Sequence, residues 1–176
     1  LLARAIPLDA HDVPARVTVM AFVRPEPGKL RIVLRAPLEA MRDVNWPSRP
    51  LGYLDLAKAA PLARDAAKLW IADYIEVREN GAVLAAPAIV ATRISLPSER
   101  TFGAWDSALA ATMGRPLAEA VEIPWNQALI DVVLEYTIAS ELSAFSIRPQ
   151  LARLGQQTTT VLRFISPTGV ERAYQY

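Results

Sequence analysis

The amino-acid sequence predicts a mainly β protein, an antiparallel β-sandwich of immunoglobulin-like character with one or two short inserted helices. Segments with two-residue periodicity, the turn sequences between them, and short stretches with helical spacing support this prediction. A length of 176 residues fits one domain. We assign that domain to residues 13–176, preceded by an N-terminal arm or export-signal remnant at residues 1–12.

Apolar side chains alternate with polar ones in several segments, which is typical of strands with one buried face. Residues 130–138 are the clearest case, with Asp131 and Glu135 on the polar side, where we expect them to face water. Residues 15–23 are apolar on both faces, as in a central strand. Further strands are expected at residues 30–35, 88–96 and 160–165.

Turn sequences separate the expected strands. Asn80 and Gly81 lie between residues 75–78 and 83–84, and this pair is a strong hairpin signal. Residues 25–28 and 166–169 contain proline and glycine and fit tight connections. The second of these turns leads to a last expected strand at residues 170–176.

Two stretches are expected to be helical. Residues 61–72 carry apolar side chains at helical spacing, and Pro61 suits the first position of a helix. Residues 101–113 are expected to form a second helix that ends at Gly114. Residues 37–52 contain three prolines and are expected to form a long ordered loop.

Charge and cysteine content exclude several classes of function. The 19 basic and 18 acidic residues are interspersed and give a net charge of +1, so we expect no nucleic-acid partner. The absence of cysteine excludes disulfides, thiol nucleophiles and iron–sulfur clusters. No glycine-rich phosphate loop is present, and we expect no cofactor. The longest apolar stretch, residues 82–91, is about half the length of a membrane span, so none is expected.

The sequence contains no set of residues that indicates a catalytic site, and we expect a protein that is not an enzyme. A serine triad would need His11, the single histidine, yet no Gly-x-Ser-x-Gly motif accompanies it. Asp131 and Glu135 are separated by roughly 13 Å along a strand, too far for a glycosidase pair. His11 is the one candidate metal ligand, but a site without a second histidine is incomplete. We therefore assign no metal.

The tryptophans Trp46, Trp70, Trp105 and Trp125 lie near turns or the ends of expected elements. Two interpretations stay open: they close the ends of the core, or they form an exposed aromatic patch for a partner. The loop around Trp46 is our choice for such a surface, because loops on a rigid β scaffold frequently carry binding residues. Its candidate partner-binding residues are Arg42, Asn45, Trp46 and Arg49.

Several short segments resemble the N-terminal region of bacterial HupE/UreJ-like membrane proteins. They are HDVP at 11–14, PLEAMRDV at 37–44, GYLDL at 52–56, LWIAD at 69–73, SLPS at 95–98, WNQ at 125–127 and VLRF at 161–164. In that family the region follows an export signal and precedes membrane helices that resemble nickel permeases of hydrogenase and urease maturation. Those helices have no counterpart here, so no functional residue is carried over.

The resemblance implies a periplasmic or extracytoplasmic location. The leading hypothesis is a non-catalytic interaction or scaffold module that docks on an integral membrane protein or on a respiratory, hydrogenase or photosynthetic membrane complex. One alternative is a domain that delivers nickel or copper to a permease, with His11 and nearby acidic residues as its ligands. Another is a carbohydrate-active enzyme with carboxylates from different strands.

Overall fold

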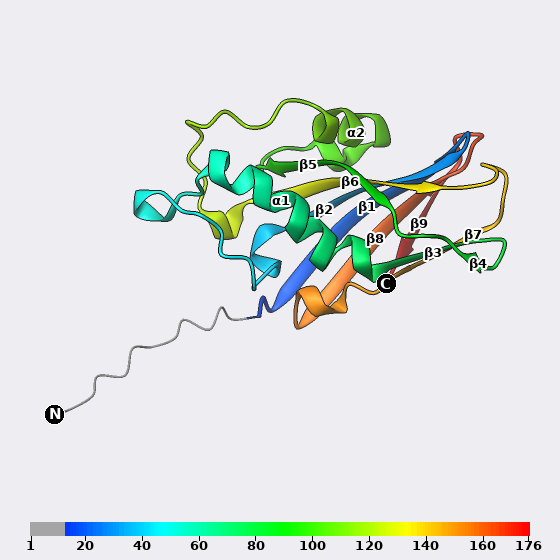
Figure 1. Ribbon diagram of the computed structural model, residues 1–176, viewed down its shortest axis with the longest axis horizontal. Helices are drawn as coiled ribbons and strands as arrows, with labels where there is room; N and C mark the ends of the chain where they lie inside the picture. Colours follow the sequence, from blue (N-terminus) through cyan, green and yellow to red (C-terminus); the bar gives the residue numbers. More distant parts are fainter. Residues whose placement is uncertain (1–12) are drawn as a thin grey trace.

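The computed structural model describes residues 13–176 (Figure 1), and the predicted arm at residues 1–12 lies outside this range. The strands are β1 (Arg16–Glu26), β2 (Lys29–Pro37), β3 (Ile75–Glu79), β4 (Ala82–Val83), β5 (Ala88–Ser95), β6 (Leu129–Thr137), β7 (Phe145–Pro149), β8 (Gln157–Ile165) and β9 (Glu171–Gln175). The helices are α1 (Leu56–Trp70) and α2 (Trp105–Met113). Short 3-10 helices are η1 (Leu38–Ala40), η2 (Pro50–Gly52), η3 (Ala72–Tyr74), η4 (Thr101–Gly103), η5 (Trp125–Gln127) and η6 (Ala152–Leu154).

The strands of residues 13–176 form two sheets. The larger sheet has six strands in the order β5-β6-β2-β1-β8-β9, and the smaller sheet has three in the order β4-β3-β7. Within the described chain, the pairing of β1 with β8 is parallel, whereas the other neighbours run antiparallel. A mainly β protein with mostly antiparallel strands and two helices is thus confirmed.

One face of the larger sheet carries the main hydrophobic core. Two-residue periodicity places Val19 of β1 and Ile32 of β2 on this face, where both are buried. Ala63 of α1 and Val77 of β3 are buried in the same cluster. The helix and the smaller sheet therefore cover this face together.

The opposite face of the larger sheet is covered over part of its area by η4 and α2. Phe22 of β1 lies in a second buried cluster with Phe102 of η4 and Trp105 of α2. The ring centroids of Phe22 and Trp105 are 6.5 Å apart in an edge-on arrangement, which is a favourable aromatic geometry. Because η4 and α2 cover this face, residues of the sheet that were expected to face water, such as Asp131, are buried.

Helix α1 begins earlier than the sequence indicated. The expected helix started at Pro61, but α1 starts at Leu56, and Asp55 caps it by accepting a hydrogen bond from the amide of Lys58 at 3.3 Å. Pro61 lies inside the helix. The capping carboxylate of Asp55 satisfies one of the free amides of the first turn, which favours a helix start at Leu56 rather than at the proline.

The expected turns are present, and one strand is new. Asn80 and Gly81 connect β3 to β4 with positive φ angles of 49° and 88°, as a tight hairpin requires. β7 was not predicted, although Phe145 and Ile147 alternate with polar residues. It pairs with β3 and forms an edge of the smaller sheet.

Candidate binding groove

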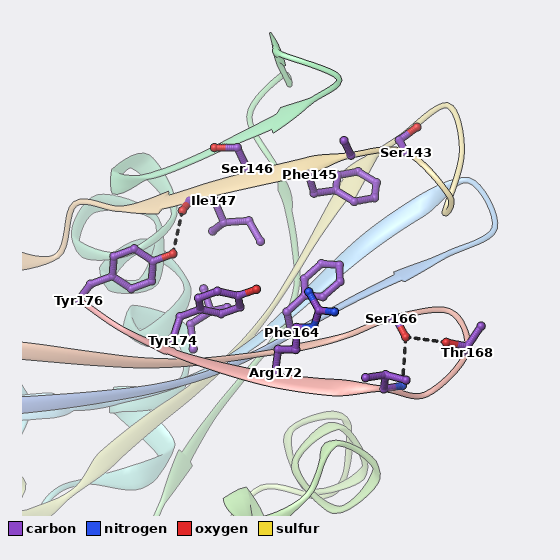
Figure 2. Close-up of a pocket in the computed structure, with 13 residues that line it drawn as sticks. Ser143, Phe145, Ser146, Ile147, Phe164, Ser166, Thr168, Arg172, Tyr174 and Tyr176 are labelled. Atoms are coloured by element: carbon purple, nitrogen blue, oxygen red, sulfur yellow. Dashed lines mark hydrogen bonds between the residues drawn. The ribbon is translucent and has the colours of Figure 1, made fainter.

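An open groove separates β7 of the smaller sheet from β8 and β9 of the larger sheet (Figure 2). Its volume is about 660 Å³. Its floor is apolar and consists of Phe145 and Ile147 of β7 with Leu162 and Phe164 of β8. Apolar side chains that line an open groove favour contact with the apolar side chains of a ligand or partner.

Three side chains that alternate along the chain point into the groove (Figure 2). Arg172 and Tyr174 belong to β9, and Tyr176 follows directly after it. Tyr174 is 45% exposed and Tyr176 is 53% exposed. The Arg172 side chain is exposed and makes no hydrogen bond or ion pair with any residue between 13 and 176. The groove thus offers two tyrosines and an uncompensated positive charge.

β9 leaves backbone groups unpaired along its outer edge. Thr160 and Tyr176 exchange two hydrogen bonds of 3.0 Å, and the amide of Ser166 donates to the carbonyl of Val170 at 2.9 Å. Because paired residues alternate in an antiparallel ladder, the N–H and C=O groups that point away from β8 are those of Glu171, Ala173 and Gln175. These groups form an edge that can accept another strand.

β7 presents a second open edge across the groove. The amide of Gln150 donates to the carbonyl of Tyr74, and the amide of Asn80 donates to the carbonyl of Ala144, both at 2.8 Å. By the same alternation, Phe145 and Ile147 direct their backbone groups away from β3. The Tyr176 hydroxyl approaches the Ile147 carbonyl at 3.5 Å and bridges the two edges at one end of the groove.

The other edges of the two sheets are better protected. β4 has two residues, and β5 has a register shift between Ile89 and Ala91 and packs against α1. Short strands, bulges and covering helices are the usual ways to block unwanted pairing at an edge. β7 and β9 pair with their neighbours in continuous register and lie on the same side of the molecule (Figure 1). The edges without a bulge, a covering helix or a shortened strand therefore flank the groove.

Glu79 fixes the loop at the rim of the groove. Its carboxylate accepts hydrogen bonds from the amides of Ala139 and Ser140 at 2.9–3.0 Å. The Ala139 amide, the Ser143 hydroxyl and the Ser140 amide hold the pKa of Glu79 below its ordinary value of 4.5. The neighbouring Asn80 side chain accepts from the amide of Ala144 at 3.0 Å. Both contacts hold the segment that leads into β7.

Replacing Glu79 by glutamine is expected to lower the free energy of unfolding at pH 7, because the amide group cannot accept all of these hydrogen bonds. The lowered folded-state pKa means that ionised Glu79 stabilises the fold fully above pH 4.5 and loses this effect as the pH falls through the folded-state value. The difference in the free energy of unfolding between wild type and Glu79→Gln should therefore become smaller below pH 4.5. Urea unfolding at several pH values measures this difference.

Glu141→Gln is the matched control for this prediction, because Glu141 lies in the same loop and its carboxylate makes no hydrogen bond with residues 13–176. Its unfolding free energy should match wild type across the same pH range. A Glu79→Gln difference that stays constant with pH would contradict the assigned role of the carboxylate.

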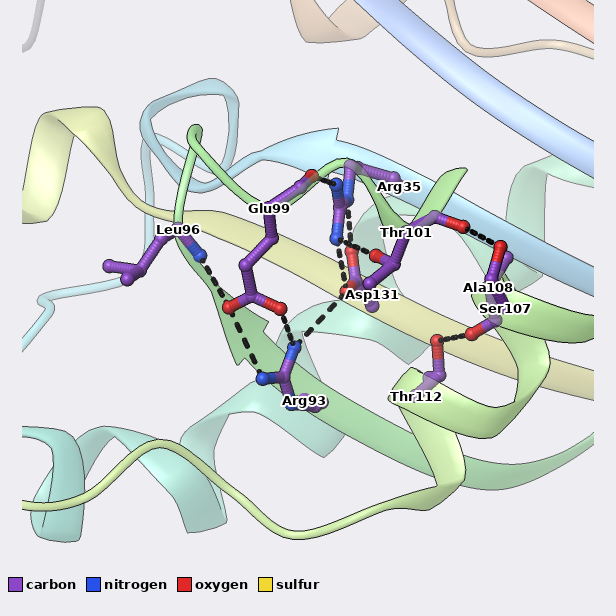
Figure 3. Close-up of polar contacts among 9 residues, drawn as sticks. All are labelled: Arg35, Arg93, Leu96, Glu99, Thr101, Ser107, Ala108, Thr112 and Asp131. Atoms are coloured by element: carbon purple, nitrogen blue, oxygen red, sulfur yellow. Dashed lines mark hydrogen bonds and ion pairs between the residues drawn. The ribbon is translucent and has the colours of Figure 1, made fainter. Parts of the chain in front are cut away.

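A buried group of charged side chains lies on the opposite face of the larger sheet (Figure 3). Asp131 of β6 accepts hydrogen bonds from Arg35 of β2 at 2.7 and 2.8 Å. Arg93 of β5 lies 3.8 Å from Asp131 and donates to Glu99 at 2.8 and 3.2 Å. Arg35 also donates to the carbonyl of Glu99 and to the Thr101 hydroxyl. We name these four charged residues the Asp131 cluster.

The expectation that Asp131 faces water was wrong. Its side chain is 0% exposed, because η4 and the segment before it cover this part of the sheet. Burial raises the pKa of Asp131, while the hydrogen bonds and charge of Arg35 act in the opposite direction. Glu135 lies on the same side of β6 and pairs with Arg31 at 2.6 Å. The Asp131 cluster holds the covering segment to the sheet.

The four predicted partner-binding residues lie in the loop between η1 and η2, and they differ in exposure. Trp46 is 6% exposed and belongs to the main core, so it offers little surface to a partner. Arg42 donates to the carbonyl of Arg153 at 3.1 Å, and Arg49 donates to that of Val121 at 2.7 Å. Asn45 is exposed. A binding role for this loop stays a prediction.

An exposed residue that the sequence did not single out follows this loop. Leu51 is 91% exposed and has a φ of 69°, a conformation that costs free energy for a residue with a β-carbon. Trp70 and Trp105 are buried like Trp46, and Trp125 is partly buried against the main core. The tryptophans thus agree with the interpretation that they close the core, and Leu51 is the exposed apolar group of this region.

The predicted metal ligand and the expected absence of a membrane span remain to be compared with the fold. His11 lies outside the described residues, so its metal role stays a prediction. Between residues 13 and 176, no cluster of three or more histidine, cysteine, aspartate or glutamate side chains could hold a metal ion. Across the same range, no helix is both long and apolar enough to cross a membrane.

No protein-family model and no curated protein sequence matches the chain. The resemblance to HupE/UreJ-like proteins accordingly stays a prediction, and the groove is interpreted from its own geometry.

The groove was missed by sequence reasoning because β7 was missed. A signal was available in the alternation of Phe145 and Ile147 with Ser146 and Arg148. It is short, and it follows a loop without a strong turn sequence. The sequence predicted the strand with Tyr174, but not what lies opposite it.

Proposed function

We propose that this chain is a non-catalytic interaction module that binds an extended segment of a partner protein in the groove between β7 and β9. The open backbone edges beside an apolar, tyrosine-lined groove are the observation that carries this proposal. Strand addition uses such edges for affinity and the adjoining side-chain pockets for specificity. Exposed tyrosines are also frequent contributors to protein interfaces.

The partner we propose is an integral membrane protein or membrane complex on the extracytoplasmic side. This part of the proposal rests on the resemblance described above, which places such a domain next to membrane helices. We also propose that the two sheets form a sandwich of immunoglobulin-like character, a class of domain that frequently serves as an interaction module. Binding through the groove would hold the domain at the membrane through its partner.

Site-specific photo-crosslinking in native membranes tests this function. A photoreactive amino acid at position 174 should form adducts with a membrane protein, because Tyr174 points into the groove. The Tyr174→Lys variant should bind membranes at least about tenfold more weakly, since it places an unpaired charge against the apolar floor. Recovery of the chain with membranes at low salt, quantified by immunoblot, gives the affinity difference.

Leu69 provides the matched control, because it is 57% exposed on α1 and does not line the groove. A photoreactive group there should give no adduct, and Leu69→Lys should bind membranes as wild type does. Adducts from position 51 instead of position 174 would assign docking to the region of Leu51 and refute the groove. A wild-type chain that never sediments with membranes would refute a membrane partner.

A further inference from the structure

We propose that the groove selects a partner segment in which an acidic side chain lies two positions from an aromatic or β-branched one, and that this segment pairs with β9. The inference rests on the function proposed above and adds the chemistry of the partner. It follows from the unpaired edge of β9 and from the uncompensated charge of Arg172.

Strand geometry fixes which partner side chains enter the groove. A strand added to β9 would exchange hydrogen bonds with Ala173, whose N–H and C=O point outward. Partner residues across from Arg172 and Tyr174 would then point to the same face as those two side chains. The groove therefore contacts two partner positions that are separated by one residue.

The position beside Arg172 favours an acidic residue. Arg172 has no acidic partner within residues 13–176, and no aspartate or glutamate lines the groove. Phe164, its neighbour on β8, provides an apolar surface on one side. An aspartate or glutamate directly across would lie about 4.5–5.5 Å away between β-carbons, close enough to form an ion pair. A lysine there would be repelled.

The position beside Tyr174 favours a large apolar side chain. Tyr174 lies next to Leu162 on β8 and faces the β7 residues Phe145 and Ile147 across the groove. Aromatic and β-branched residues form favourable cross-strand pairs with tyrosine. Such a side chain would cover the tyrosine face and fill part of the apolar floor.

β9 is the better edge for this strand than β7. All five residues of β9 are exposed, whereas Ile147 of β7 already has the Tyr176 hydroxyl at its carbonyl. A second copy of the chain is a less suitable occupant. Antiparallel self-pairing centred on Ala173 would set Arg172 opposite Tyr174 and would supply no acid. The charge thus favours a different protein.

Two synthetic nine-residue peptides test the proposal with the full chain. In both peptides, threonine alternates with residues that would face the groove. Two of these groove-facing residues are a tyrosine and, two positions away, a variable residue. The variable residue is glutamate in one peptide and lysine in the other. By fluorescence anisotropy, the glutamate peptide should bind wild type about tenfold more tightly. Arg172→Glu should reverse this preference. Equal affinities, or no binding of either peptide, would overturn the inference.

Arg148→Glu is the matched control, because it changes the net charge equally, and Arg148 is an exposed residue of β7 that does not line the groove. It should leave the preference for the glutamate peptide unchanged. Loss of the preference in Arg148→Glu as well as in Arg172→Glu would show a response to net charge alone and would overturn the assignment to Arg172.

Amide hydrogen exchange identifies the edge that is used. Bound glutamate peptide should slow exchange at Glu171, Ala173 and Gln175, whereas slowing at Phe145 and Ile147 instead would place the strand on β7 and overturn the assignment. Concentration-dependent dimerisation that protects the same β9 amides without peptide would favour self-pairing and also overturn it. Failure of these peptides leaves crosslinking from position 174 intact, so the two proposals fail separately.

Discussion

Asp131→Asn is expected to lower the free energy of unfolding by about 3–5 kcal/mol, the usual cost of breaking a buried ion pair on one side. The change removes the negative charge that compensates Arg35 and Arg93 where Asp131 is fully buried. Arg35 is itself 6% exposed, so water cannot replace the lost carboxylate. Urea unfolding at pH 7, followed by tryptophan fluorescence, measures the loss.

A double variant separates the effect of the buried charges of Asp131 and Arg35 from the effect of their side-chain packing. Asp131→Leu combined with Arg35→Met should be more stable than Asp131→Asn, because neither charge of the pair is then left without its partner. If Asp131→Asn is as stable as wild type, the carboxylate does not hold η4 to the sheet as described. If the double variant is the least stable, packing rather than charge dominates the site.

Trp70→Ala is expected to lower the free energy of unfolding by about 3–5 kcal/mol. Trp70 ends α1, is buried in the main core, and carries the guanidinium group of Arg153 at 4.0 Å from its ring centroid. The Arg42 guanidinium lies 5.8 Å from the same ring. Truncation would therefore leave a cavity and remove the aromatic surface on which these two cations rest. Equilibrium denaturation in urea gives the value.

The Arg153→Met variant measures how much of the loss in Trp70→Ala comes from the contact between the cation and the ring. It keeps an extended side chain over Trp70 and removes the charge, so it should cost no more than about 1 kcal/mol. Trp70→Phe should lie between this variant and Trp70→Ala. A Trp70→Ala loss no larger than that of Arg153→Met would mean that the tryptophan does not close the core.

Most strands could be predicted because apolar and polar residues alternate along a strand that has one buried face. β6 shows why the same rule fails for individual residues: Asp131 and Glu135 share a side, but η4 covers the first while the second stays at the surface. Periodicity identifies the two faces of a strand and contains no information about a distant segment that later covers one of them. The burial of Asp131 depends on that tertiary contact.

The start of α1 shows a different limit. Pro61 suits the first turn of a helix because its ring fixes φ, and for that reason it indicated the helix start. The helix begins instead at Leu56, where the Asp55 carboxylate caps the first turn and the chain continues through the proline. The sequence prediction used the proline alone, and only the folded chain shows that the capping hydrogen bond of Asp55 forms.

β7 was overlooked for a related reason. Its five residues are too few for periodicity to distinguish a strand from an ordered loop. Its place in the fold comes from pairing with β3, which lies far away in the sequence. The groove depends on this pairing and on the position of β9, so the sequence predicted the strand that carries the two tyrosines without indicating that they line a groove.

The parallel pairing of β1 with β8 has a consequence for biosynthesis. Arg16 lies beside Gln157, so the first strand of the sheet lacks its second neighbour until most of the chain has left the ribosome. At ~5–20 residues per second this delay lasts on the order of ten seconds. During that time the nascent β1–β2 hairpin has an unpaired edge, and unpaired strand edges make a partly folded chain prone to aggregation.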